Sequence, residues 1–213
     1  PLLRNWQAEK LLAKSKEYQG IGKFQADRLE EEDAVKTAEK ASLLAPSNMA
    51  IARNLAEVYY IVDPVKGLER WETVVKMRGA TLEDRLRVVK LALQGAGDSE
   101  SRARNSRIRG FNATRIHFLD IARRQLELLA RDERYKERFE FRLAAAEYLA
   151  EIGNPNAALA AIQSLRNERE TLGFKAELLF CRIAISTKQP ELIEEAIRVL
   201  NKLAASGGDA AIE

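Results

Sequence analysis

The side chains best suited to acid–base or nucleophilic chemistry are scarce in this sequence. His117 is the only histidine and Cys181 the only cysteine, and both stand among large apolar residues. A catalytic base needs a nucleophile or a metal ion within reach, and neither residue belongs to a motif that supplies one. We therefore interpret His117 as a structural or surface residue and Cys181 as a small buried apolar residue. A ligand-filled pocket around His117 would instead favour an enzyme.

Two short segments resemble ligand-binding motifs in composition but not in context. Gly20-Ile21-Gly22-Lys23 resembles a phosphate-binding loop, yet position 17 is Glu and no Ser or Thr follows the lysine. Such a loop also needs a preceding strand, and the sequence predicts none there. The acidic run 30–33 is typical of a helix start, where the helix dipole favours negative charge. We expect no catalytic residues, no metal site and no cofactor.

Arginine is concentrated in the middle of the chain. All basic residues between 98 and 134 are arginines, and guanidinium groups bind phosphates well. This favours a polyanion such as nucleic acid as a possible partner. The candidate contacts are Arg102, Arg104, Arg107, Arg109 and Arg115. Because the segment offers a single aromatic residue, Phe111, for base stacking, polyanion binding is the alternative and not the first hypothesis.

Composition limits the fold class and the compartment. The 213 residues are 46% hydrophobic with a mean hydropathy of −0.33, enough for a sizeable core. Ala, Leu, Glu, Lys and Arg dominate while Gly and Pro are sparse, which favours helix. No apolar run approaches the length of a membrane span. A single cysteine excludes an intrachain disulfide and suits a reducing compartment, so we expect a cytoplasmic protein. The first residue, Pro1, is equally compatible with a piece of a longer, membrane-anchored polypeptide.

Small and large apolar residues recur with a period of about 34 residues. The pattern appears at Gly22 and Ala56, and again at Ala146 and Cys181. Such a period is typical of stacked helix pairs, each too small to bury its own apolar face. The expected helices cover about 2–29, 33–45, 48–61, 64–77, 81–95, 113–131, 133–151, 155–165, 172–187 and 190–204.

The residues at these positions resemble the tetratricopeptide repeat pattern. The matching segments are Tyr18-x2-Ile21-Gly22 with Ala34, Ala41 and Pro46; Leu55-Ala56-x2-Tyr59 with Gly67-x3-Trp71; and Ala145-Ala146-x2-Leu149 with Gly153 and Ala158-x3-Ile162. A weaker copy begins with the helix at 81–95, and a last one lies near Cys181. The resemblance covers most of the chain outside 98–114.

This resemblance implies an all-α, right-handed superhelix, a TPR-like solenoid of about five helix pairs. We expect N-terminal repeats in 1–97 and C-terminal repeats of the same solenoid in 115–204. Between them, the polar segment 98–114 is predicted to be a long Arg-rich loop, and 205–213 a disordered tail. The last helix has a charged side, which predicts that it closes the array, because a terminal repeat needs a polar outer face.

The resemblance also implies a function, because the concave face of such arrays usually binds protein segments. In some members Lys, Asn and Arg from three successive first helices grip a terminal carboxylate. Asn54 and Arg87 match two of those positions, whereas other positions of the clamp do not match. We therefore expect a looser groove for a peptide or partner helix, formed by Lys23, Arg53, Asn54, Glu57, Tyr60 and Arg87. The first functional hypothesis is a non-catalytic protein-interaction scaffold.

Overall fold

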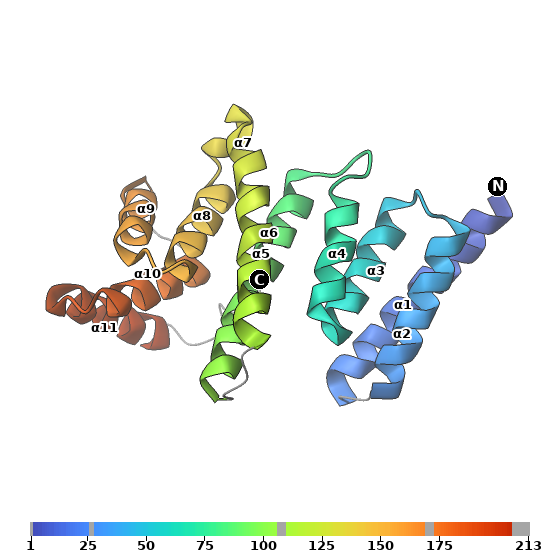
Figure 1. Cartoon of the computed structure of the whole chain (residues 1–213), viewed down its shortest axis with the longest axis horizontal. Coiled ribbons are helices and arrows are strands. Elements are labelled where there is room, and N and C mark those ends of the chain that lie inside the picture. Colours follow the sequence, from blue (N-terminus) through green and yellow to red (C-terminus); the bar gives the residue numbers. More distant parts are fainter. Residues whose placement is uncertain (1, 26–27, 106–109, 169–172, 206–213) are drawn as a thin grey trace. The chain divides into compact units, whose positions relative to one another are not determined.

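All regular structure in the described part of the chain is helical (Figure 1). The computed structural model describes residues 2–25, 28–105, 110–168 and 173–205, and their side chains outside 2, 18–32 and 99–112. The helices are α1 (Leu2–Gln25), α2 (Arg28–Leu44), α3 (Met49–Val62), α4 (Pro64–Val74), α5 (Leu82–Asn105), α6 (Gly110–Ala130), α7 (Glu133–Lys136), α8 (Phe139–Glu151), α9 (Pro155–Glu168), α10 (Phe174–Thr187) and α11 (Pro190–Ala205). The all-α prediction is confirmed.

Polar residues between the helices begin the next helix by accepting its first N–H groups. Asn48 Oδ1 accepts from the N–H groups of Ala50 and Ile51 at 3.0 and 3.3 Å. Asp63 accepts from Lys66 N–H at 3.2 Å, and Pro64 occupies the first turn of α4. Such side chains satisfy N–H groups that have no partner within the helix. The expected helix starts at these turns are therefore confirmed.

The first compact unit, Pro1–Leu91, is built from helices that pack in sequence order. α1 packs on α2, α2 on α3 and α3 on α4, and α1 also contacts α3. Alanines make these close contacts possible: Ala8 and Ala41 are fully buried with Ile51, and Ala34 and Ala38 are buried with Leu55 and Val58. Small residues let large ones from the neighbouring helix fill the space between the backbones.

Gly67 shows the same principle at the crossing of α3 and α4. A Cβ atom at this position would lie 2.3 Å from the Cα atom of Tyr60, so only glycine allows the two backbones to approach so closely. One turn further along α4, Trp71 is 3% exposed. The Gly67-x3-Trp71 segment of the predicted repeat is thus a helix-packing device.

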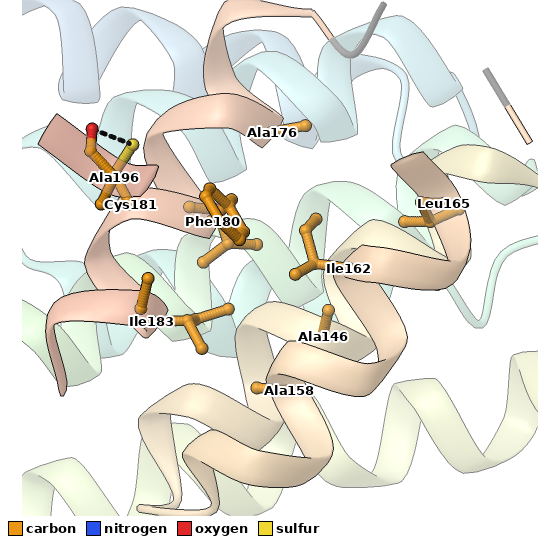
Figure 2. Packing of buried hydrophobic residues seen from close by; sticks show 11 residues of the cluster. Ala146, Ala158, Ile162, Leu165, Ala176, Phe180, Cys181, Ile183 and Ala196 are labelled. Atoms are coloured by element: carbon orange, nitrogen blue, oxygen red, sulfur yellow. Dashed lines mark hydrogen bonds between the residues drawn. The ribbon is translucent and has the colours of Figure 1, made fainter. Parts of the chain in front are cut away.

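The second compact unit, Ala92–Glu213, continues the sequential pairing. α6 packs on α8, α8 on α9, α9 on α10 and α10 on α11. Figure 2 shows the core of the last four helices, where Phe180 and Ile162 lie among small residues such as Ala146 and Ala158. All four of these residues are 0% exposed. The described residues thus form five helix pairs plus the short α7, as expected for a helical-repeat protein. That both units belong to one continuous array stays a prediction.

The structure corrects the expected loop over 98–114. α5 continues to Asn105 and α6 begins at Gly110, with residues 106–109 outside the described part. The helix expected to end at 95 therefore continues, and Gly95 and Gly97 lie inside α5. Gly95 is buried there, since an added Cβ would lie 2.6 Å from the ring of Phe118 on α6. Gly95 therefore allows close packing of α5 on α6, and the predicted helix end at this residue is wrong.

The helix expected over 133–151 is interrupted. α7 ends at Lys136 and α8 begins at Phe139, with Arg138 between them in an extended conformation, φ −70° and ψ 135°. Asp132 begins α7 by accepting from Arg134 N–H at 3.1 Å. The predicted disordered tail, 205–213, lies outside the described residues except for Ala205, the last residue of α11.

Candidate functional site

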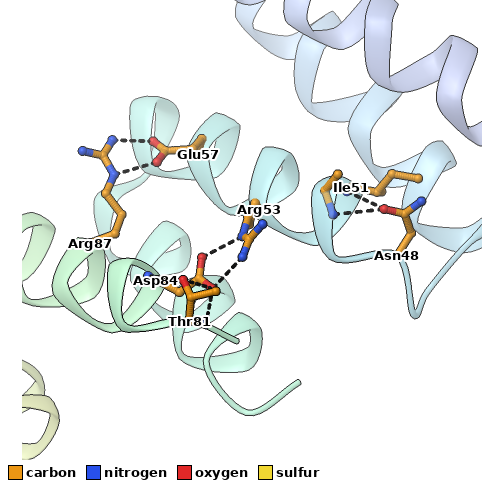
Figure 3. Close-up of polar contacts among 8 residues, drawn as sticks. Asn48, Ile51, Arg53, Glu57, Thr81, Asp84 and Arg87 are labelled. Carbon is orange, nitrogen blue, oxygen red and sulfur yellow. Dashed lines mark hydrogen bonds and ion pairs between the residues drawn. The ribbon is translucent and has the colours of Figure 1, made fainter. Parts of the chain in front are cut away.

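The residues predicted to line a groove include an arginine that joins two helices of the first unit. Arg53 on α3 donates two hydrogen bonds to Asp84 on α5, at 2.6 and 2.7 Å (Figure 3). Asp84 is 5% exposed at its side chain, whereas Arg53 is 37% exposed. The carboxylate is therefore buried beneath a guanidinium whose other edge faces solvent.

A second arginine pair lies one helical turn further along the same two helices. Arg87 on α5 donates to both carboxylate oxygens of Glu57 on α3, at 2.7 and 2.8 Å (Figure 3). Both side chains are partly exposed, at 45% and 31%. A further turn along, the Tyr60 hydroxyl donates to the carbonyl of Leu91 at 2.8 Å. Three of the predicted groove residues on α3 thus each reach across to α5.

Asn54 lies below this row, in the interior. It is 6% exposed, and its Nδ2 donates to the hydroxyl of Ser15 on α1 at 3.0 Å. Ser15 in turn donates to the carbonyl of Ala34 on α2 at 3.1 Å. This chain of hydrogen bonds ties α3, α1 and α2 together. Asn54 therefore has a structural role, with little of its side chain left at the surface.

The Arg53–Asp84 pair has a clear electrostatic consequence. Burial by itself would raise the pKa of Asp84, but the hydrogen bonds from Arg53 and from Thr81 outweigh it and hold that pKa below its usual value. The Thr81 N–H donates to Asp84 at 2.8 Å, and the Asp84 N–H donates to the Thr81 hydroxyl at 3.3 Å. These reciprocal bonds form a capping box at the start of α5.

Sequence reasoning missed Asp84, Ser15 and Leu91 as partners of the groove residues. The spacing Thr81-x-x-Asp84 is a capping-box signal that could have identified Asp84 as a structural carboxylate. No local pattern points to Ser15 or to the carbonyl of Leu91, because each is defined only by a helix that packs against it.

The structure does not describe the side chains of the remaining groove candidate and of most polyanion candidates. Lys23 lies within α1, and Arg102 and Arg104 within α5, where side chains are not described. Arg107 and Arg109 fall in 106–109, outside the described residues.

The side chain of Arg115, the last of the polyanion candidates, is described and contacts Glu151. Its guanidinium donates to the backbone carbonyl of Glu151 and lies 3.9 Å from the Glu151 carboxylate. Arg182 on α10 approaches the same carboxylate at 3.0 Å. These three side chains line an open cavity of about 350 Å³ with Ser186 and the residues at the end of α8. Both arginines contact Glu151. Arg115 thereby links α6 to the end of α8, and Arg182 links α10 to it.

Neither of the two residues first considered for catalysis lines this cavity. His117 is exposed, 6.2 Å from the ring of Phe118 between centroids. Cys181 is 2% exposed, and burial raises the pKa of its thiol. Its S–H donates to the carbonyl of Ala196 at 3.6 Å, which supports the interpretation of a packed core residue. Within the described residues, no group of three or more His, Cys, Asp or Glu side chains is arranged to hold a metal ion.

Comparison with known proteins identifies no family. No protein-family model matches the chain, and no curated protein matches it. Among solved structures, the chain is similar to the crystal structure of MamA protein at 15% identity, covering 94% of this chain and 96% of that one, with a TM-score of 0.48. It is also similar to the DHF119 filament (20% identity, 99% and 98% coverage, TM-score 0.23) and to the de novo designed helical repeat protein DHR64 (19%, 99% and 97%, 0.22). None of these similarities assigns a ligand, a partner or a reaction to this chain.

Across the described helices, none combines the length and the apolar character needed to traverse a bilayer.

Proposed function

We propose that this chain is a non-catalytic protein-interaction scaffold of the tetratricopeptide type. A peptide or partner helix lies across α3 and the first half of α5, against the row of Arg53, Glu57, Tyr60 and Arg87, and Lys23 on α1 extends the contact. The observation that carries the proposal is that side chains from successive first helices are held side by side on one face by two arginine–carboxylate pairs.

The fixed position of the arginines supports binding. Each guanidinium gives two of its five N–H groups to its own carboxylate, so further donors remain for a partner's carbonyl or carboxylate oxygens. Arg53 and Arg87 are 37% and 45% exposed. A side chain that is already held in place loses little conformational freedom on binding, which favours affinity. Asn54 enters as the support beneath this row.

The mixed charge of the row favours a protein over a polyanion. Glu57 stands beside Arg87 and Asp84 beneath Arg53, and these carboxylates would repel a run of phosphates. A protein segment presents both donors and acceptors, so it can satisfy both signs of charge. The described candidate of the Arg-rich segment, Arg115, is engaged with Glu151, and it adds no support to phosphate binding.

Exchanging the charges of one pair tests the proposal without removing an ion pair. Glu57→Arg combined with Arg87→Glu keeps a salt bridge between α3 and α5 but inverts its direction. A matched control is Arg142→Glu with Glu168→Arg, because this pair joins α8 to α9 at 2.5 and 2.8 Å in the second unit. Both double variants should melt close to the wild type.

The readout is the affinity of a partner that is captured by the wild-type protein and identified by mass spectrometry. We expect the exchange at 57 and 87 to weaken that partner's binding at least tenfold and the exchange at 142 and 168 to leave it unchanged. Equal affinity for all three proteins would refute the site. Titration with duplex DNA at two salt concentrations separates the polyanion hypothesis, because phosphate contacts weaken steeply as salt rises.

A further inference from the structure

The last two helix pairs repeat each other in a constant register. α8 begins at Phe139 and α10 at Phe174; α9 begins at Pro155 and α11 at Pro190. Both offsets are 35 residues, so every position of the pair α8–α9 has an equivalent in the pair α10–α11. Burial at equivalent positions can therefore be compared directly.

In the pair α8–α9 the residues of one apolar face are buried or partly buried. Ala158, Ile162 and Leu165 on α9 are at most 2% exposed and belong to the core cluster shared with α10. Phe139 and Leu143 on α8 pack against the same cluster. This face receives the following helix of the array.

Among the described residues, the equivalent face of the last pair is partly exposed. Ile197, which corresponds to the buried Ile162, is 50% exposed. Phe174 and Leu178 on α10, which correspond to Phe139 and Leu143, are each 38% exposed. We call the group formed by Phe174, Leu178, Ile185, Ile193 and Ile197 the end face. Its Ile185 is 49% exposed, and Ile193 is partly exposed.

Helical geometry places Ile193 and Ile197 on the side of α11 opposite Glu195. Glu195 of α11 accepts a hydrogen bond from Arg166 of α9 at 2.6 Å, which fixes the side of α11 that faces α9. Residues two positions before and after Glu195 are rotated by about 160° from it around the helix axis. Ile193 and Ile197 therefore point away from α9. The charged side expected on α11 is exposed, and Ile197 beside it is exposed as well; that α11 closes the array stays a prediction.

We propose that a second copy of this chain covers the end face, with the two α11 helices packed antiparallel about a two-fold axis. The charge pattern of α11 supports this occupant. Its first half carries Glu191 and Glu194, and its second half carries Arg198 and Lys202, all of them exposed. In an antiparallel pair, the acidic half of one helix lies beside the basic half of the other. Two-fold dimers with the same patch on both subunits are the commonest soluble oligomers.

A single substitution in the end face should weaken the proposed dimer. Sedimentation velocity over a range of protein concentrations should show a dimer for the wild type. Ile197→Lys places a charge at the centre of the end face, and we expect it to raise the dimer dissociation constant at least tenfold. Ile116→Lys is the matched control, because Ile116 on α6 is 66% exposed but lies outside the end face. It should leave dimerisation unchanged, and thermal melting should show both variants folded.

Charge reversal tests the antiparallel arrangement. Glu194→Lys places lysines of the two copies near each other, which should weaken the dimer, and adding Lys202→Glu should restore it. A chain ending at Ala205 should dimerise like the full chain.

Four results would overturn the proposal. A wild-type monomer at all concentrations would do so, as would a dimer indifferent to Ile197→Lys. No rescue by the double reversal would exclude the antiparallel pairing. A dimer lost on removal of 206–213 would assign the contact to that segment instead.

Discussion

Arg53 and Asp84 lie 31 residues apart in sequence and join α3 to α5 through two hydrogen bonds of 2.6 and 2.7 Å. Asp84 is nearly buried, and Arg87 forms a similar but more exposed pair with Glu57. The two pairs differ mainly in how much of the carboxylate is removed from water. The two pairs therefore allow the stability contribution of a buried ion pair to be compared with that of an exposed one between the same two helices.

Removal of Arg53 should destabilise the fold more than removal of Arg87. Arg53→Ala leaves a buried carboxylate without its guanidinium, at an expected cost of about 1–3 kcal/mol in unfolding free energy. Arg87→Ala removes a solvent-screened pair, and we expect it to cost less than about 1 kcal/mol. Urea denaturation of the two variants measures the difference. Equal losses would mean that the burial of Asp84 has no energetic consequence.

The carboxylate of Asp84 should make the stability of the fold sensitive to acid. The pKa of Asp84 is lower in the folded chain than usual, so its ionised form stabilises the fold above its unfolded pKa of about 3.9. This contribution is lost as the pH falls below that value, through the folded pKa. The difference in unfolding free energy between the wild type and Asp84→Asn should therefore be constant near pH 7 and narrow below about pH 4. A pH-independent difference would contradict the assignment.

Two glycine substitutions should have opposite effects. In Gly67→Ala the new Cβ would lie 2.3 Å from the backbone of Tyr60, so α3 and α4 must separate, at an expected cost of about 1–3 kcal/mol. At Gly97, inside α5, no described atom lies within 4 Å of an added Cβ apart from its own helix. Gly97→Ala should stabilise the fold by up to about 1 kcal/mol, because alanine favours helix. Thermal melting compares the two directly, and a stabilised Gly67→Ala variant would disprove the close crossing.

The end of α10 offers a stabilising substitution. Lys188 adopts a left-handed conformation, φ 58° and ψ 20°, which costs energy for any residue with a Cβ. Lys188→Gly should raise the unfolding free energy by about 0.5–1 kcal/mol. The reverse change at a left-handed glycine is the control: Gly153→Ala, at φ 79°, should lower it by a similar amount. Chemical denaturation that shows no gain for Lys188→Gly would contradict the strain argument.

Much of the fold follows from local sequence signals. Asn48 and Asp63-Pro64 mark helix starts because their side chains or ring geometry satisfy the first turn of the helix that follows. The alanines and Gly67 predict close helix crossings because only small side chains let backbones approach. At Gly95, where the expected helix 81–95 ends, the sequence is ambiguous, because glycine is favoured both at a helix end and at a close helix contact. Only the position of Phe118 in space distinguishes them.

The contacts of the candidate site follow less from the sequence, because a charge on a helix does not reveal its partner. The sequence shows Arg53, Glu57 and Arg87 as polar residues of two helices, and their use in binding stays a prediction. Their pairing depends on the rotation and spacing of two helices, which no single-helix pattern contains. Asn54 is the next residue after Arg53, about 100° further around the axis of α3, and it lies in the interior, bonded to Ser15.

Ile162 and Ile197 show that the sequence of a helix does not by itself determine how deeply its apolar residues are buried. They are the same residue at equivalent positions of consecutive repeats, and the 35-residue period alone identifies them as apolar positions of two amphipathic helices. One is 0% and the other 50% exposed. The sequence determines that each helix has an apolar side, because that property is local. The tertiary structure decides whether that side is covered, because burial depends on a further layer of helices packed against it.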